Sequence, residues 1–265
     1  MSSPTTTAPR PTGPSEPTGD VLLRARGVSL SFGSVRALKD VDLDLRAGEI
    51  TAIVGDNGAG KSTFVKCVAG VHRPDDGTIE LGGDAVSFRD PQEAREAGIE
   101  TVHQSLALVE DLAVWQNLYL NRELTKGVGP FRVLDRRGMR AGARDMVSGL
   151  SVNVPSTTSR VRRLSGGQRQ AVAICRAAGF SSRLVIMDEP TAALGVQETE
   201  RVEALIRRLR DDGRAVLLVS HNFEQVMRLS DQVWVMRSGR CAAGRRTEDT
   251  TGEEIVALIT GAKSA

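Results

Sequence analysis

The stretch ITAIVGDNGAGKST, residues 50 to 63, decides the fold of this 265-residue chain. Its first five residues form a continuous apolar run, which is typical of a strand buried on both faces of a sheet. The next nine, Gly55 to Thr63, fit the pattern G-x-x-x-x-G-K-[ST], and the amphipathic segment FVKCVAG follows them. A strand, a glycine-rich loop and a helix in this order form the context in which such a loop binds nucleotide phosphates.

Each part of this loop has a physical role in that interpretation. Gly55, Gly58 and Gly60 let backbone N–H groups converge on phosphate oxygens, and the start of the next helix adds a positive dipole end. We expect Lys61 between the β- and γ-phosphates and Ser62 on a Mg²⁺ ion. A plain glycine-rich turn is the alternative, but it needs neither the lysine nor the serine. We therefore assign nucleotide binding to the whole loop: Gly55, Asp56, Asn57, Gly58, Ala59, Gly60, Lys61, Ser62 and Thr63.

Two adjacent carboxylates end a later apolar segment, LVIMDE, residues 184 to 189. Ligand sites of open α/β sheets lie at the carboxyl ends of strands, where two acidic side chains are costly unless a metal ion or a reacting group uses them. We expect Asp188 to hold Mg²⁺ through water and Glu189 to polarise the attacking water as general base. A helix cap or a turn would account for the pair in isolation. The phosphate-binding loop favours the catalytic interpretation.

The remaining pattern predicts an α/β fold with a mainly parallel sheet core and an antiparallel, β-rich edge. VLLRARGVSLSF (21–32) and VDLDL (41–45) alternate as half-buried strands. After residue 180, strand-like segments alternate with helical ones, which implies a largely parallel sheet wrapped by helices. The expected strands there are RLVIMDEP, AVLLVS and QVWVMR, and the expected helices are QETERVEALIRRLR and NFEQVMRLS.

The middle of the chain, residues 91–150, is predicted to be mostly helical, with a strand candidate at residues 98–102 and its longest helix at residues 135–150. In the helix after residue 197 we expect Glu203 and Arg207 to pair on the outer face. The apolar positions of that helix, at i, i+3, i+4 and i+7, are Val202, Leu205, Ile206 and Leu209.

Composition limits the class of protein. Apolar residues make up 40% and charged residues 26%, as in ordinary globular chains, and the net charge of +2 indicates no particular partner. Residues 1–20 hold five prolines among serines and threonines, so we predict a disordered tail. No run approaches the roughly 18 apolar residues that span a membrane, and no secretory signal opens the chain.

Clustered arginines raise the alternative of a nucleic-acid surface. No aromatic residues interleave with them and acidic residues are interspersed elsewhere, so a solvated helical face is the preferred interpretation and no nucleic-acid partner is expected. The arginines are Arg136, Arg137, Arg140, Arg144, Arg160, Arg162 and Arg163.

The segment LSGGQRQ, residues 164 to 170, supplies the decisive resemblance. Ser165, Gly166 and Gly167 open a predicted helix, so a hydroxyl and backbone donors gather at a positive end that suits an anion. A simple capped helix start is the alternative. Together with the two preceding motifs, this segment resembles the signature sequence of ABC (ATP-binding cassette) transporter ATPases, and the resemblance covers about residues 21–265.

This resemblance implies a P-loop NTPase fold of ABC type, with residues 21–103 and 180–265 as an ATP-binding core and residues 104–179 as an inserted helical subdomain. It implies ATP and Mg²⁺ as cofactors. In the family, two cassettes sandwich two nucleotides, and the signature faces the γ-phosphate of ATP on the other subunit. A second cassette is therefore an expected partner, with a homodimer as the simplest form. The implied ATP contacts of the signature are Ser165, Gly166, Gly167 and Gln168.

Three smaller matches carry further family roles. Gln104 resembles the glutamine that touches the Mg²⁺ and water region, and His221 resembles the switch histidine that contacts the γ-phosphate. Phe32 lies where an aromatic ring stacks on adenine. His72 and His103 are interpreted as structural or exposed. The implied catalytic residues are thus Glu189, His221 and Gln104, and the implied metal ligands are Ser62, Gln104 and Asp188.

One position departs from the family pattern. Gly195 in TAALGV stands where many ABC ATPases carry an aspartate that bridges the subunits. With residues 98–124, this segment resembles the ATPases of bacterial monosaccharide importers of the ribose, xylose and fructose type. That resemblance implies import of a monosaccharide through transmembrane permease subunits, a solute-binding protein as an indirect partner, and a peripheral place on the cytoplasmic face of the cell membrane. The alternatives are an ABC exporter ATPase and an ABC ATPase that acts on nucleic acid.

Overall fold

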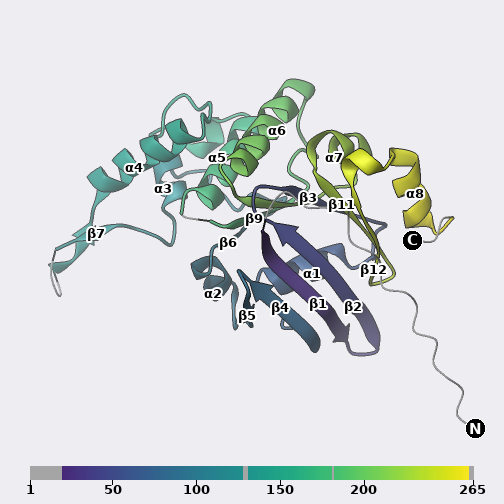
Figure 1. The fold of residues 1–265 in the computed structure, drawn as a ribbon. Helices are drawn as coiled ribbons and strands as arrows, with labels where there is room; N and C mark the ends of the chain where they lie inside the picture. The colour runs from purple at the N-terminus through teal and green to yellow at the C-terminus, as the bar shows by residue number, and fades with distance from the viewer. Residues whose placement is uncertain (1–19, 128–130, 181, 263–265) are drawn as a thin grey trace, which may run out of the picture.

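A six-stranded central sheet organises the chain, which a computed structural model describes over residues 20–127, 131–180 and 182–262 (Figure 1). Five neighbouring strands are parallel, and the edge strand β12 pairs antiparallel with β11. The order across the sheet is β12 (Arg240–Arg246), β11 (Gln232–Arg237), β3 (Ile50–Val54), β10 (Ala215–Val219), β9 (Leu184–Asp188) and β6 (Ile99–Val102). The predicted strands RLVIMDEP, AVLLVS and QVWVMR, and the candidate at residues 98–102, are confirmed.

A second, antiparallel sheet forms the predicted β-rich edge. Its order is β2 (Val35–Arg46), β1 (Val21–Phe32), β4 (Asp76–Leu81) and β5 (Asp84–Val86). The predicted strand over residues 21–32 is confirmed, and VDLDL lies within β2. β2 alternates buried and partly exposed residues over Val41–Arg46, because one face packs on the core, whereas β1 is less regular and buries Val28–Leu30 in a row.

The central sheet separates two apolar cores. Ile50, Ala52 and Val54 face one core together with the helices α3 to α8, whereas Ile53 faces the other together with Phe64 of α1 and the antiparallel sheet. Successive side chains of a strand point to opposite faces, so burial on both faces requires an uninterrupted apolar run. This is why ITAIV lacks polar alternation.

The helices fall on the two sides of this sheet (Figure 1). Helix α1 lies between the two sheets, while α3, α4 and α5, which fall in the chain between β6 and β9, gather beyond the other face. The helices are α1 (Lys61–Val68), α2 (Pro91–Glu96), α3 (Val114–Leu118), α4 (Arg136–Gly149), α5 (Gly166–Ala178), α6 (Val196–Asp211), α7 (Phe223–Leu229) and α8 (Gly252–Thr260), with 3-10 turns at Val161–Arg163 and Thr247–Asp249. None in the described ranges is long and apolar enough to cross a membrane.

The prediction for residues 91–150 was right for the helices α2, α3 and α4 and for the strand β6, but helices do not cover most of the described residues between them. Helix α3 has five residues, and a projecting hairpin of β7 (Thr125–Lys126) and β8 (Val133–Leu134) follows it. Gly127 adopts a positive φ of 105° beside this hairpin, a conformation that glycine reaches without strain. Strands of two residues are too short to give a periodic signal.

The prediction for Glu203 and Arg207 in α6 was right about the pair and wrong about its place on the outer face. The four apolar positions are buried as expected, but Glu203 is also buried, with a side chain only 3% exposed. It pairs with Arg228 of α7 at 2.6 Å and with Arg207 at 3.5 Å, so it faces the protein rather than solvent. The strand β12 and the helix α8 were not predicted. The predicted tail, residues 1–20, lies outside the described residues apart from Asp20.

Candidate nucleotide-binding site

The glycine-rich loop joins β3 to α1 in a conformation that depends on glycine. Gly55 has a φ of 149°, and a Cβ there would lie 2.2 Å from the carbonyl oxygen of Met236. Gly60, with a φ of 104°, is the N-cap of α1, and a Cβ there would lie 3.0 Å from the carbonyl oxygen of Ala37. The loop is therefore pressed against neighbouring backbone, and a larger residue at either position would displace it.

The start of α1 has no anion of its own. No side chain caps this helix and its first turn holds no acidic residue, so its leading N–H groups remain suited to an anion. Lys61 begins the helix, and its Nζ donates to the carbonyl oxygens of Gly55 at 2.6 Å and Asp56 at 3.0 Å. Ser62 and Thr63 follow in the same turn, with Asn57 and Gly58 exposed at the tip and Ala59 buried beneath.

Burial acts on the charge of Lys61. It lowers the pKa of the amino group, while the negative charges of Glu189, Asp56 and Asp188 act in the opposite direction. These residues therefore share one electrostatic environment, although they come from β3, α1 and β9. The cation of Lys61 and the leading N–H groups of α1 suit a bound phosphate, whereas the nearby carboxylates suit a metal ion that would accompany it.

The carboxylates lie where β9 ends. Asp188 is paired in register with Val219 of β10, and the next residue, Glu189, turns into the left-handed region with a φ of 51°. Its N–H donates to the carbonyl oxygen of Val219 at 2.9 Å, which holds this turn. A left-handed backbone at a residue other than glycine costs on the order of 1 kcal/mol and clusters at functional sites.

Glu189 contacts His221 directly. Its Oε1 lies 2.6 Å from Nδ1 of the histidine, which follows the end of β10. The glutamate side chain is 18% exposed and the histidine 76%, so the pair joins a sheltered carboxylate to an imidazole in solvent. The glutamate can hold a water molecule, and the exposed histidine can reach a negative charge beyond the carboxyl ends of the strands.

Gln104 faces the same region from the loop after β6. It lines a cavity of about 300 Å³ together with Glu189 and Gly166. The glutamine side chain is exposed, as expected for a residue that awaits a ligand or a partner group. The cavity thus places the candidate base, the candidate glutamine and the first residue of α5 around one space.

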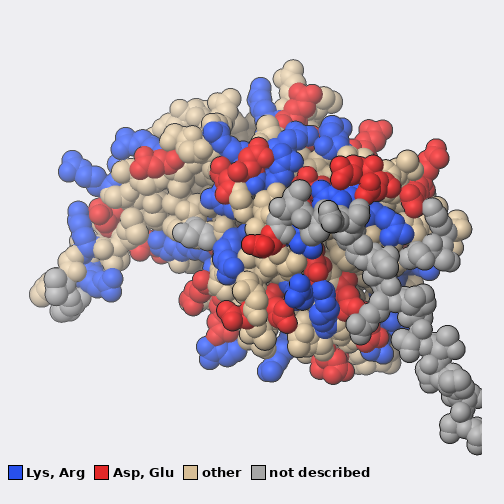
Figure 2. Space-filling view, in the orientation of Figure 1, with Lys and Arg blue, Asp and Glu red and all other residues tan. Residues whose placement is uncertain are grey.

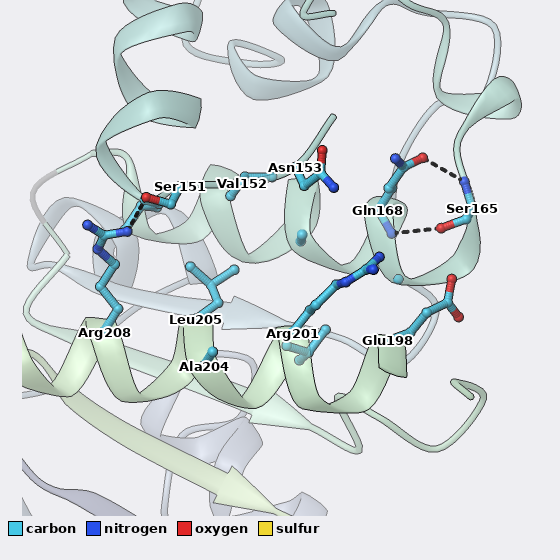
Figure 3. Close-up of a pocket in the computed structure, with 14 residues that line it drawn as sticks. Ser151, Val152, Asn153, Ser165, Gln168, Glu198, Arg201, Ala204, Leu205 and Arg208 are labelled. Atoms are coloured by element: carbon cyan, nitrogen blue, oxygen red, sulfur yellow. Dashed lines mark hydrogen bonds between the residues drawn. The ribbon is translucent and has the colours of Figure 1, made fainter. Parts of the chain in front are cut away.

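The first turn of α5, which carries the signature residues, is capped by its own side chains. Ser165 is the N-cap of α5: its Oγ accepts from the N–H of Gln168 at 3.3 Å, and its own N–H donates to Oε1 of Gln168 at 3.0 Å. This reciprocal pair is a capping box. Ser165, Gly167 and Gln168 line a second cavity, of about 220 Å³, against α6 and the end of α4 (Figure 3). In a single chain these three residues are therefore not gathered with the glycine-rich loop.

Phe32 ends β1 and its side chain is exposed, 49% by area. Its ring meets that of His72 edge to face, with centroids 5.2 Å apart. The structural role expected for His72 thus includes support of this ring. His103 is exposed at the end of β6 and belongs to no cluster of metal-ligand residues in the described ranges.

Sequence reasoning missed a buried network behind the site. Gln225 donates to Oγ1 of Thr191 at 2.8 Å and to Oε1 of Glu203 at 3.2 Å, and it accepts from Oγ of Ser220 at 3.3 Å. Asn222 caps α7 by accepting from the N–H of Gln225 at 3.0 Å. The pattern Asn-x-x-Gln, close to a capping box, is the signal that could have pointed to Gln225.

The comparison with protein families now decides the identity of this site. A model described as "ABC transporter" matches residues 38–192, more than half of the chain. The chain belongs to the ABC transporter family. It is therefore an ATP-binding cassette, an ATPase whose glycine-rich loop and LVIMDE segment lie in the matched range, as does LSGGQRQ.

Its relatives include two of similar length. The fructose import ATP-binding protein FrcA of Rhizobium meliloti is 47% identical over 246 residues, which is 91% of this cassette and 95% of the relative. The xylose/arabinose import ATP-binding protein XylG of Sulfolobus acidocaldarius is 41% identical over 239 residues, 90% of this cassette and 94% of the relative. The predicted resemblance to monosaccharide importer ATPases is confirmed.

Solved structures confirm the fold. The ADP conformation of an ATP-binding cassette of an ABC transporter superposes with a TM-score of 0.75 at 23% identity and covers 91% of this cassette and 95% of that chain. The predicted P-loop NTPase fold of ABC type, with its mainly parallel core and antiparallel edge, is therefore correct.

Proposed function

We propose that this cassette powers the import of a monosaccharide by hydrolysing ATP between two cassettes that dock on membrane permeases. The observation that carries the catalytic part is the 2.6 Å contact between Glu189 and His221, beside the partly buried charge of Lys61.

The glycine-rich loop holds the phosphates. Lys61 exchanges its two carbonyl contacts for the β- and γ-phosphate oxygens, which are stronger, charged acceptors. The open N–H groups of α1 and the loop backbone from Gly55 to Gly60 supply the rest of the cradle. Phe32, exposed and supported by His72, stacks on the adenine ring.

The donors near the loop suit a magnesium ion. Ser62 offers a hydroxyl oxygen in the first turn of α1, and Asp188 offers a carboxylate at the end of β9 close to Lys61. Mg²⁺ prefers such oxygen ligands, few in number, with waters and phosphates completing its shell. Gln104 is assigned to the same ion and to the attacking water. When bound, the ion neutralises charge that develops on the phosphate oxygens.

The residues assigned to the hydrolytic step lie at the carboxyl ends of β9 and β10. Glu189 orients and polarises the attacking water, because its carboxylate is sheltered and its backbone turn fixes its direction. His221 holds the carboxylate on one side and reaches the γ-phosphate on the other. The glutamate is thus the base, and the histidine is a sensor of the phosphate.

A partner cassette completes the site. In one chain the signature residues Ser165, Gly166, Gly167 and Gln168 open α5 without an external ligand. A hydroxyl and backbone N–H groups at a helix start suit a phosphate. We assign them to the γ-phosphate on the other cassette, expected to be a second copy of this chain. Residues 21–103 and 180–265 then act as the ATP-binding core and residues 104–179 as the signature subdomain.

The similarity to fructose and xylose/arabinose import ATPases over nine-tenths of the chain supports monosaccharide import. Permease subunits would hold the cassettes at the cytoplasmic face of the membrane, and a solute-binding protein would deliver the sugar. The nucleic-acid alternative has less support. Acidic and basic side chains are interspersed over the visible surface (Figure 2), Arg162 pairs with Asp111, and Arg140 lies over the ring of Trp115.

Reconstitution tests this function. The cassette, co-purified with the permease that binds it, is placed in vesicles, and uptake of labelled fructose, xylose, arabinose and ribose is followed with ATP at the cassette face. We expect uptake of at least one sugar that stops in the Glu189→Gln variant. ATP turnover that ignores both permease and sugar, without uptake, would contradict import.

A further inference from the structure

Glu198 lies where two helices begin. It is the third residue of α6, whose N-cap is Gly195, and it faces the first turn of α5 (Figure 3). The side chain points from α6 toward the segment that carries Ser165 and Gln168. No role has been given to this glutamate above.

Two glycines at the start of α5 allow Glu198 to approach this helix closely. A Cβ on Gly167 would lie 2.8 Å from Cβ of Glu198 and 3.1 Å from its carboxyl carbon, and a Cβ on Gly166 would lie 3.8 Å from its Oε2. The two glycines therefore leave room for the carboxylate against the backbone of α5. An alanine at position 167 would push it away.

The start of α5 acts on the charge of this carboxylate. The Ser165 hydroxyl and the N–H groups of Gly167 and Gly195 hold the pKa of the Glu198 carboxyl below its usual value, and the charge of Arg201 adds to the effect. The carboxylate thus lies against the first turn of α5 and near the first residues of its own helix, where helix dipoles favour a negative charge.

The same turn of α5 is the one assigned to the γ-phosphate on a partner cassette. The Glu198 carboxylate lies where that phosphate would approach Ser165 and Gly167, and the two anions repel each other. One must leave when the other arrives.

We propose that Glu198 is a built-in occupant of the signature anion site: its carboxylate lies on the first turn of α5 in the separated cassette and is displaced by the nucleotide of a partner. This inference rests on the composite site of the proposed function. The exchange sets a threshold for closure, because the incoming phosphate must displace a negative charge that already lies there. Since Glu198 belongs to the first turn of α6, its displacement also acts on the start of that helix.

Nucleotide-dependent dimer formation tests the exchange. The full chain carrying Glu189→Gln, which keeps ATP intact, is titrated with Mg·ATP, and the dimer fraction is measured by analytical ultracentrifugation. Adding Glu198→Gln keeps the shape and a hydrogen-bond acceptor but removes the charge. We expect the ATP concentration at half-dimerisation to fall at least threefold. Glu200→Gln, at an exposed position two residues further along α6, is the matched control and should leave it within twofold.

Two results would overturn the proposal. One is an unchanged ATP concentration at half-dimerisation in Glu198→Gln. The other is an equal decrease of that concentration in Glu200→Gln, which would show that the effect comes from net charge alone. If the Glu189→Gln parent fails to dimerise at any ATP concentration, the composite site itself is wrong. Hydrogen exchange of the nucleotide-free chain gives a second measurement. The Gly167 amide should exchange faster in Glu198→Ala than in the wild type. Equal protection in the two proteins would contradict the proposed contact between Glu198 and α5.

Discussion

The helices α1 and α5 both begin with glycine-rich segments and both are assigned to phosphate, yet their starts differ. The start of α1 has no side-chain cap and no acidic residue in its first turn, and its first residue is the cation Lys61. The start of α5 has a capping box between Ser165 and Gln168 and the carboxylate of Glu198 on its first turn.

This difference separates a site that can act alone from one that needs a partner. At α1 a phosphate finds open backbone donors, and Lys61 exchanges two neutral carbonyl acceptors for charged ones, so binding is favourable. At α5 a phosphate must first displace a carboxylate from the same turn, so binding gains only the difference between the two anions. A single cassette should therefore bind ATP at α1 and leave α5 closed to it.

The largest effect is expected from the base beside the α1 site. Glu189→Gln preserves size but removes the carboxylate that polarises water, so the rate of hydrolysis should fall about 100-fold or more. The check is steady-state phosphate release together with equilibrium ATP binding, which should change little. Turnover equal to that of wild type would remove Glu189 from the mechanism.

Next in size is the loss of the cation at α1. Lys61→Ala removes a charged partner of the phosphates, worth roughly 1.5–3 kcal/mol, so ATP should bind the isolated cassette roughly 10- to 100-fold more weakly. Binding of a fluorescent ATP analogue measures this. Lys66→Ala, at an exposed position of the same helix, is the control. Equal affinity of Lys61→Ala and wild type would contradict the phosphate cradle.

A smaller effect is expected at α5. Ser165→Ala removes the N-cap oxygen, so the free energy of unfolding should fall by about 1 kcal/mol, while ATP binding to the isolated cassette should stay within about twofold. Denaturant unfolding and the same binding assay check both. Ser148→Ala, near the end of α4, should change stability by less than about 0.5 kcal/mol. A large loss of ATP affinity in Ser165→Ala would break the contrast between the two helix starts.

The smallest effect concerns Gly195. It has an ordinary φ of −71° and no atom near its absent side chain, so aspartate fits there and caps α6 better than glycine. Gly195→Asp should therefore raise the free energy of unfolding by a few tenths of a kcal/mol. Thermal unfolding measures this. A destabilised aspartate variant would indicate a clash with the carboxylate of Glu198.

Much of the fold was predictable because the central strands are buried on both faces. ITAIV and AVLLV contain only apolar side chains apart from Thr51, and α6 shows a regular apolar stripe, so local pattern and tertiary burial agree. The hairpin at residues 125–134 and the edge strand β12 gave no such signal. Their residues are exposed or mixed in polarity, and pairing partners rather than pattern define them.

The site was predictable to the extent that its chemistry lies in short contiguous motifs. Lys61, Asp188 and Glu189 share one environment as expected, and His221 contacts Glu189. What the sequence could not indicate were contacts between distant helices. The burial of Glu203 and the reach of Glu198 onto α5 depend on how α6 packs against its neighbours, which no local period encodes.

The buried amide of Gln225 has one further consequence. It ties Thr191, two residues past the base, to the helix that follows His221, and Arg228 with Glu203 fastens the same helix to α6. The two loops that carry Glu189 and His221 are thus connected through the same buried side chains. A displacement of either loop should therefore displace the other, so the two catalytic groups should move as one unit.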